Sequence, residues 1–169
     1  MDEIFIIIGL ILLNGVFAMA EIALVSARKS SLQEDAKRGN KAAKTALNLA
    51  NEPDKFLSTV QIGITLIGIL TGIYSGNKIA LLLSDKIHAM GLSESYSASL
   101  AQFIIILLVT YLTLVFGELL PKRIGMSGAE KVAKIMSRPM LWLSVVASPF
   151  VWILSKSSRL MVAEAFCET

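Results

Sequence analysis

Four apolar runs alternate with polar segments along the chain, and three of them are long enough to cross a bilayer as helices. These three cover about residues 4–25, 56–75 and 99–120. The fourth, about residues 139–154, is short for a span, contains two prolines and has basic residues on both sides. We therefore predict an all-α membrane protein with three transmembrane helices, in which the fourth run is re-entrant or interfacial. A fourth true span is the alternative.

The polar segments differ in charge, and this difference predicts the topology. Residues 28–54 are rich in lysine and arginine, as is the chain after residue 121, whereas residues 77–98 contain two lysines and no arginine. Basic loops stay in the cytoplasm, so we expect a multi-pass protein of the cell membrane (a bacterial inner or plasma membrane) with its N-terminus outside and its C-terminus inside. A basic segment between two spans is better explained in this way than by binding to nucleic acid.

The polar segments also contain helix signals. Ser31–Glu34 has the form of a capping box, so a short amphipathic helix is expected to begin there and to end near Gly39. A second, alanine-rich helical segment is expected from Ala42 to Ala50. In the outer loop we expect a short surface helix at about residues 79–87, and on the cytoplasmic side a belt of juxtamembrane helices over about residues 124–165.

The composition supports a membrane protein and disfavours several other classes. Of the 169 residues, 54% are hydrophobic, and the mean hydropathy is +0.67. A single cysteine cannot form an intrachain disulfide, and a single histidine disfavours a zinc or histidine-based catalytic centre. No nucleophile–base pair falls on a predicted common surface, so an enzyme is not expected. Asp2 and Glu3, in place of a basic start, indicate that the first run is a retained anchor and not a signal peptide.

The stretch Gly117–Lys122, at the end of the third run, is the first candidate functional site. Glu118 is an ionisable residue in an apolar segment, where its cost makes a functional role the default hypothesis. Pro121 has no N–H and disfavours helix at Leu120, so nearby carbonyls lose their usual partners. Carbonyls and a carboxylate together form the all-oxygen environment that a hard cation prefers. The alternative is a helix that ends at the interface, with Glu118 reaching water.

Polar residues in the other two runs strengthen the cation hypothesis. Asn14 lies about 15 Å from the outer end of its helix at a rise of about 1.5 Å per residue. The second run carries a stripe of polar and small residues at three- and four-residue steps: Ser58, Gln61, Thr65, Gly68 and Gly72. Glycines at this spacing are typical of a helix–helix packing seam. Together with Glu21 and Glu118, the polar residues fall between the midplane and the cytoplasmic edge, which indicates an oxygen-lined cavity for a cation.

Three sequence blocks carry a family resemblance. They are Asn14-Gly15-x-Phe17-Ala18-x-Ala20-Glu21-x-Ala23, Leu57-Ser58-Thr59-x-Gln61-x-Gly63-x-Thr65, and Gly117-Glu118-Leu119-x-Pro121-Lys122. In this order they resemble the CNNM/CorC magnesium-transporter family over essentially the whole chain. The resemblance implies a homodimer with three spans and a cytoplasmic belt in each protomer. It also implies a central Mg²⁺ site, transport coupled to Na⁺, and cytoplasmic CBS modules that follow this domain in full-length members.

Carried over by position, the resemblance makes Glu118 the acidic metal ligand. The neutral ligands would be Asn14, Ser58, Gln61 and Thr65, although Gln61 and Thr65 vary from the asparagine of some members. Four further residues would bind a second cation or have a structural role: Glu21, Gly117, Pro121 and Lys122. For Glu21 we favour an ion pair with Lys122 or Arg123, or a place on a cation route. The expected function is Mg²⁺ transport, with efflux as the direction; the alternative is a membrane anchor and ion sensor that regulates the cytoplasmic modules.

The topology can be tested by labelling introduced cysteines with a membrane-impermeant reagent. We expect positions in the outer loop, at residues 80–89, to react from outside the cell, because this loop has few cations. Positions at residues 40–49 should react only from the cytoplasmic side, because this loop is basic. The reverse pattern of accessibility would contradict the predicted orientation.

Overall fold

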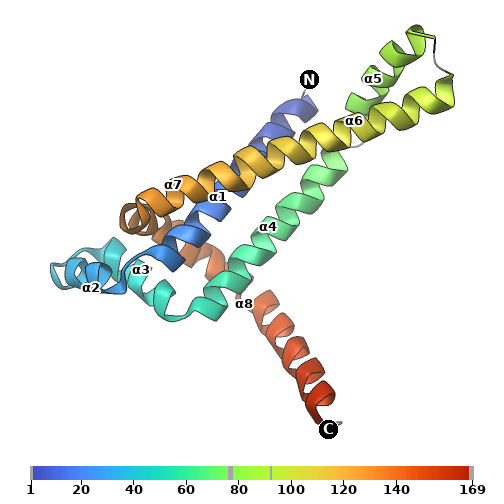
Figure 1. Cartoon of the computed structure of the whole chain (residues 1–169). Helices are drawn as coiled ribbons and strands as arrows, with labels where there is room; N and C mark the ends of the chain where they lie inside the picture. Colours follow the sequence, from blue (N-terminus) through green and yellow to red (C-terminus); the bar gives the residue numbers. More distant parts are fainter. Residues whose placement is uncertain (1, 76–77, 92, 168–169) are drawn as a thin grey trace. The chain divides into compact units, whose positions relative to one another are not determined.

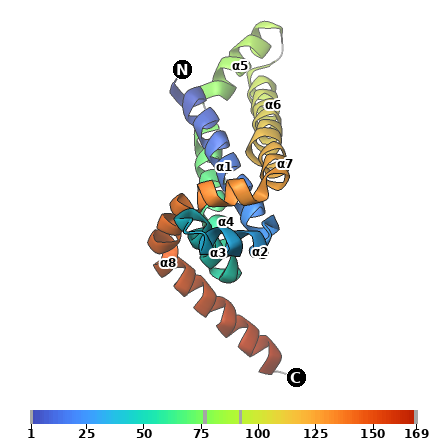
Figure 2. The same cartoon turned by 90° about the vertical axis from the view of Figure 1, so that its left-hand side faces the viewer.

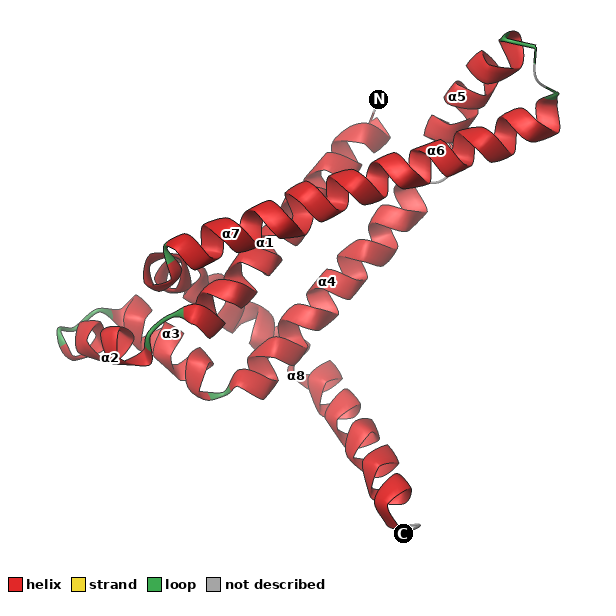
Figure 3. Ribbon diagram, viewed as in Figure 1, coloured by secondary structure: helices red, strands yellow, loops and turns green. Residues whose placement is uncertain are grey.

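The computed structural model describes residues 2–75, 78–91 and 93–167, and every regular element in this part of the chain is helical (Figure 3). In chain order (Figure 1), the helices are α1 Asp2–Ser26, α2 Lys29–Lys37, α3 Lys41–Asn51, α4 Pro53–Ser75, α5 Lys78–Ala89, α6 Glu94–Leu114, the π-helical turn η1 Val115–Leu119, α7 Leu120–Ser127 and α8 Ala129–Cys167. The predicted all-α class is confirmed.

Among the described residues, four helical stretches are long and apolar enough to cross a membrane: Ile4–Ser26, Pro53–Ala89 on the two sides of the undescribed residues 76–77, Glu94–Ser127 and Ala129–Leu154. The first three contain the three predicted spans. The fourth contains the run at residues 139–154, and α8 continues through both Pro139 and Pro149. Length and composition are thus compatible with the alternative of a fourth span, and the count of three remains a prediction.

The chain divides into two compact units, and α1 and α4 each contribute to both. Unit 1 contains Met1–Met19 and Gly63–Ser127, and unit 2 contains Ala20–Ile62 and Gly128–Thr169. The two units are described separately below.

In unit 1, α5 and α6 form a helical hairpin (Figures 1 and 2). The short helix expected at residues 79–87 is present as α5, and its position on the membrane surface remains a prediction. On α6, Ser97, Ala101 and Ile105 are buried at four-residue spacing, which forms one packed face. Elsewhere in this unit, α1 lies close to α4. A Cβ atom at Gly63 of α4 would overlap the ring of Phe17 on α1, which shows how near the two helices are.

In unit 2, the helices of the basic loop differ in part from the expectation. The capping-box prediction was wrong: α2 begins at Lys29, and its N-cap Arg28 makes no side-chain capping bond. Ser31 therefore lies within the first turn, and Leu32, which is fully buried, fixes the register of the helix. The predicted end at Gly39 is confirmed by its φ of 89°, a left-handed conformation that glycine adopts without strain.

The second helix of the basic loop, α3, confirms the alanine-rich prediction and packs against α8 (Figure 2). It is capped by Asn40, whose side chain accepts bonds from the backbone N–H groups of Ala42 and Ala43. Its buried face consists of Ala43, Ala46, Leu49 and Ala50. From α8, the Ser137 hydroxyl donates to the carbonyl of Ala42 at 3.2 Å. Small side chains on both helices thus allow the start of α8 to pack closely on the basic loop.

The expected packing seam at Gly68 and Gly72 is not formed among the described residues. A Cβ atom at either glycine would meet no atom within 4 Å. Packing within the described part of the chain therefore does not require these glycines, and we predict that they pack in the interface of a homodimer instead.

An ion pair between α2 and α8 gives unit 2 a dependence on pH. The Lys134 ammonium lies 2.8 Å from Asp35 Oδ2, and this hydrogen bond holds the pKa of the Asp35 carboxyl below its usual value. A carboxyl whose pKa falls on folding stabilises the native state above its unfolded pKa, and the contribution is lost as the pH falls through the folded pKa.

We therefore expect Lys134→Met to lower the melting temperature at pH 7. The difference from the wild type should shrink once the pH falls below about 4, near the pKa of an unperturbed aspartate. The measurement is a series of thermal melts in detergent, with Lys131→Met, an exposed lysine on the same helix, as the matched control. If the melting temperatures of the wild type and Lys134→Met differ by the same amount at pH 7 and pH 3, the stabilisation does not come from the charge of Asp35.

Candidate functional site

The centre of the candidate site is the π-helical turn η1, which contains Gly117 and Glu118. The helix does not end at Pro121, as one interpretation of the sequence expected; it continues as α7 to Ser127. The predicted loosening of the backbone is present, but as a wide turn: the Leu120 N–H donates to the Val115 carbonyl, five residues back. Proline is compatible with the first turn of the helix that follows, where a missing N–H costs little.

Asn14 on α1 supplies the hydrogen bond that Pro121 cannot make. In an uninterrupted α-helix, the Gly117 carbonyl would accept from the backbone nitrogen of residue 121, which is a proline here. The Asn14 side-chain nitrogen Nδ2 instead donates to this carbonyl at 3.0 Å, from 103 residues away in the sequence. The polar position predicted on the first helix and the proline motif predicted on the third are therefore parts of one structure.

Two glycines allow α1 to approach the wide turn. A Cβ atom at Gly15 would lie 2.8 Å from Pro121 Cγ and 2.9 Å from the Phe116 carbonyl oxygen, closer than side chains tolerate. A Cβ atom at Gly117 would lie 3.3 Å from Asn14 Nδ2. Gly15 thus permits a close neighbour, and the proline ring occupies the space.

The Asn14 side-chain oxygen Oδ1 is buried and has no hydrogen-bond partner among the described residues. The residue is only 7% exposed, so water does not readily compensate for the missing partner. The orientation of the amide follows from its neighbour: the reverse orientation would place two oxygen acceptors, Oδ1 and the Gly117 carbonyl, against each other. Asn14 therefore presents a fixed, buried acceptor where α1 contacts Gly117, the residue that precedes Glu118.

Glu118 has a partner that the sequence analysis did not assign to it. Its Oε1 atom lies 2.7 Å from the ammonium of Lys122. The signal was available, because a glutamate four residues before a lysine is the favourable order for a helical ion pair. The sequence analysis paired Lys122 with Glu21 as one option instead, and that pairing remains a prediction.

The other predicted ligands are distributed over both units. Thr65 belongs to unit 1 and is exposed on α4. Ser58, Gln61 and Glu21 belong to unit 2, where Gln61 is exposed and the other two are half-buried. The structure thus brings Asn14 to Gly117 and Lys122 to Glu118, and the participation of the remaining residues in one site stays a prediction.

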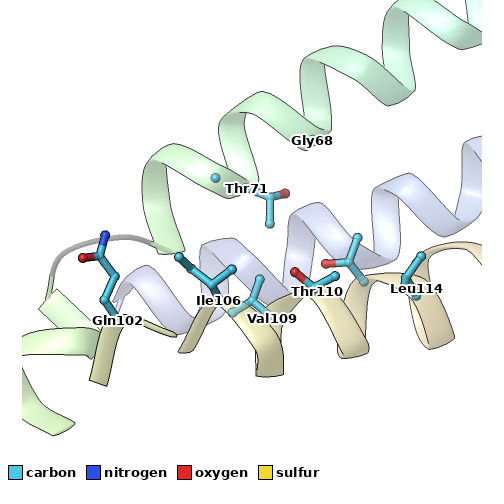
Figure 4. Close-up of a pocket in the computed structure, with 9 residues that line it drawn as sticks. Gly68, Thr71, Gln102, Ile106, Val109, Thr110 and Leu114 are labelled. Atoms are coloured by element: carbon cyan, nitrogen blue, oxygen red, sulfur yellow. The ribbon is translucent and has the colours of Figure 1, made fainter. Parts of the chain in front are cut away.

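A groove of about 420 Å³ lies in unit 1 between α4 and α6 (Figure 4). It is lined by Gly68, Thr71, Gly72, Gln102, Ile106, Val109, Thr110, Thr113 and Leu114, none of which is a predicted ligand. The Thr71 hydroxyl donates to its own helix at Ile67, whereas the buried Thr113 hydroxyl has no partner among the described residues. Within the described part of the chain, no three Asp, Glu, His or Cys side chains come together to hold a metal.

Comparison with known proteins gives a match over nearly the whole chain. Residues 5–165 match the family model of the cyclin M transmembrane N-terminal domain, abbreviated CNNM. The UPF0053 protein sll0260 of Synechocystis is 46% identical over 156 residues, which are 92% of this chain and 35% of that protein. YhdP of Bacillus subtilis is 32% identical over 95% of this chain and 36% of its own length.

A third relative has a name that states a function. The polyamine export protein of Escherichia coli K12 is 34% identical over 152 residues, which are 90% of this chain and 34% of that protein. The chain spans about a third of the length of each of these relatives.

The bond from Asn14 to the Gly117 carbonyl can be tested with a double-mutant cycle. Asn14→Ala should destabilise the protein by about 1–3 kcal/mol, the usual cost of a buried carbonyl left without a donor. In a Pro121→Ala background the same change should cost less, because residue 121 then has an N–H for this carbonyl. Unfolding in detergent gives both values, and Asn48→Ala, an exposed asparagine on α3, is the control. If Asn14→Ala lowers the free energy of unfolding equally in the wild type and in Pro121→Ala, the Asn14 side chain does not replace the missing N–H of residue 121.

Proposed function

The chain belongs to the CNNM family, and from this premise we propose that it transports a cation, Mg²⁺ in the first instance, through a site built around Glu118. Its apolar helices and its relatives make it a multi-pass membrane domain. The family is associated with transport and not with catalysis, in agreement with the sequence analysis. The identity of the cargo and the transport mechanism are the proposal.

The observation that carries the proposal is the unsatisfied Oδ1 atom of Asn14. A buried acceptor without a donor is costly unless something else binds it. Here the amide is held in place by its bond to the Gly117 carbonyl, and the next residue is the carboxylate Glu118. A fixed neutral oxygen on one helix and a carboxylate in the wide turn that this helix contacts are ligands of the kind that Mg²⁺ prefers, because Mg²⁺ binds one or two carboxylates and keeps several waters.

The complete site that we propose has Glu118 as its only anion. Asn14, Ser58, Gln61 and Thr65 supply neutral oxygens, directly or through water. The domain works as a homodimer with three spans in each protomer, with its N-terminus outside and its C-terminus in the cytoplasm next to CBS modules. Transport is directed outward and coupled to Na⁺. The packing of α8 on the basic loop supports the cytoplasmic belt, because a loop rich in lysine and arginine is expected on that side.

A polyamine is the second candidate cargo, and two observations favour it. Relatives from Escherichia coli and Haemophilus influenzae, each 34% identical to this chain, are named polyamine export proteins. In addition, the Glu118 carboxylate already binds a primary alkylammonium group, that of Lys122, at 2.7 Å. The same carboxylate therefore has the geometry to accept the ammonium end of a polyamine.

The third possibility is the anchor and sensor, in which the same site binds an ion without carrying it. Proteoliposomes with separately varied Mg²⁺ and Na⁺ gradients separate this role from transport. A transporter produces a Mg²⁺ flux that depends on these gradients, whereas a sensor binds the ion and produces no flux.

The central prediction concerns Glu118. Glu118→Gln keeps the shape of the side chain but removes the charge that offsets the cost of dehydrating Mg²⁺. We expect this variant to lose Mg²⁺-dependent thermal stabilisation, whereas Asn14→Ala and Thr65→Ala only weaken it. The stabilisation follows RT ln(1 + [L]/Kd), or about 2.7 kcal/mol at one hundred times Kd, so melting curves across a Mg²⁺ titration rank the variants.

Glu21→Gln is the matched control, since it removes the other carboxylate of the apolar segments. If Glu118→Gln retains the wild-type shift while Glu21→Gln loses it, the site lies on the other carboxylate. A parallel titration with spermidine distinguishes the cargoes: stabilisation by spermidine at concentrations where Mg²⁺ has no effect would favour the polyamine.

A further inference from the structure

We propose that Lys122 is a tethered counter-cation of the transport site: its ammonium neutralises Glu118 when the site is empty and is displaced when the cargo binds. This inference rests on the proposed function, because it concerns how the same carboxylate behaves between two rounds of transport. It adds a specific role for a residue that is not itself a ligand of the cargo.

The geometry shows an ion pair formed within one continuous helical segment. Glu118 lies in the wide turn η1, and Lys122 lies in the first turn of α7. Their charged atoms are 2.7 Å apart, and the two side chains are 43% and 34% exposed. Three further ion pairs, Arg28–Glu130, Arg38–Glu34 and Lys134–Asp35, belong to unit 2, so this pair is separate from the network that joins the basic loop to α8.

The chemistry of the carboxylate explains why a counter-cation is useful there. A bare carboxylate in an apolar helical segment is costly, and a bound cargo removes that cost only while it is present. Lys122 removes it in the empty state, because a lysine is a compact charge on a flexible stem that can leave and return. Lys122 and the cargo compete for the Glu118 carboxylate. The ion pair therefore lowers the affinity for the cargo and shortens the time for which the empty site has an unpaired negative charge.

The alternative is an ordinary helical ion pair with no effect on transport. Exposed pairs of this spacing contribute little to stability, and their removal hardly affects a neighbouring site. The two interpretations differ in what happens to the cargo when the lysine charge is removed. A bystander leaves the affinity unchanged, whereas a competitor raises it.

The test compares Lys122→Met with two charge controls in the full chain, reconstituted in nanodiscs. Mg²⁺ alone is the probe, titrated in thermal melts at constant ionic strength. Lys122→Met should lower the apparent Kd by about threefold to tenfold, since a unit positive charge within about 4 Å is removed from a partly screened site. Lys122→Gln provides the same test if the Met variant does not fold.

The controls keep or move the charge. Lys122→Arg should keep the wild-type affinity or weaken it, because the competing cation is still present. Arg123→Met removes a charge from the neighbouring residue, which is exposed and outside the Glu118 pair, and should change Kd by less than about twofold. In flux assays with proteoliposomes, Lys122→Met should lower both KM and the maximal rate. KM falls because the cargo binds more tightly, and the rate falls because the empty site completes the cycle with the Glu118 charge unpaired.

An unchanged or higher Kd for Mg²⁺ in Lys122→Met would overturn the inference. So would an equal decrease of Kd in Arg123→Met, because the effect would then come from the net charge of the region and not from the Glu118–Lys122 pair. Glu118→Gln in the same titration separates this result from a failure of the proposed function. If Glu118→Gln loses the Mg²⁺ effect while Lys122→Met matches the wild type, only the counter-cation role fails. If Glu118→Gln and the wild type titrate alike, the site itself is misplaced and both proposals fail.

Discussion

The missing backbone N–H of Pro121 is the constraint on which unit 1 of this domain depends. It removes the donor that the Gly117 carbonyl would have in a regular α-helix, and the Asn14 side chain provides a replacement from a different helix. Because that bond holds the amide, the Asn14 oxygen is fixed in a buried position without a partner. Gly15 then has to be a glycine, since any Cβ atom would overlap the proline ring. One proline thus explains a wide turn, an oriented amide and a close helix contact.

The elements that local sequence patterns determine were predicted well. The apolar runs identified the long helices because a span requires about twenty apolar residues, and Gly39 marked the end of α2 because of its left-handed backbone. The start of α2 was predicted incorrectly, since the burial of Leu32 has more influence on the register than a capping motif. The sequence left open whether the third long helix ends near Pro121; it continues, because a helix can accommodate a proline with one wide turn.

The candidate site shows a different limit. Asn14 and Glu118 could be chosen from the sequence, because polar side chains in apolar runs are costly and therefore informative. The partner of Asn14 could not be chosen, because 103 residues separate it from Gly117 and no local pattern connects them. The Glu118–Lys122 pair is local and follows from the four-residue spacing alone, so the sequence contained enough information to predict it. The glycines at positions 68 and 72 matched a packing motif, but a motif does not identify which surface is packed.

The wide turn also sets the rotational phase of the helix. Buried positions at Ser97, Ala101, Ile105, Gly117 and Gly125 are separated by multiples of four residues. In an α-helix, four residues overshoot a full turn by about 40°, so such a stripe would wind around the axis. The extra residue in η1 takes back part of this rotation, so the stripe winds less than it would in a regular α-helix. A deletion of one residue between Val115 and Leu119 would be absorbed by conversion of η1 into a regular α-helix, so α7 would keep its rotational phase while the wide turn itself would be lost. In this segment the number of residues determines whether the wide turn exists.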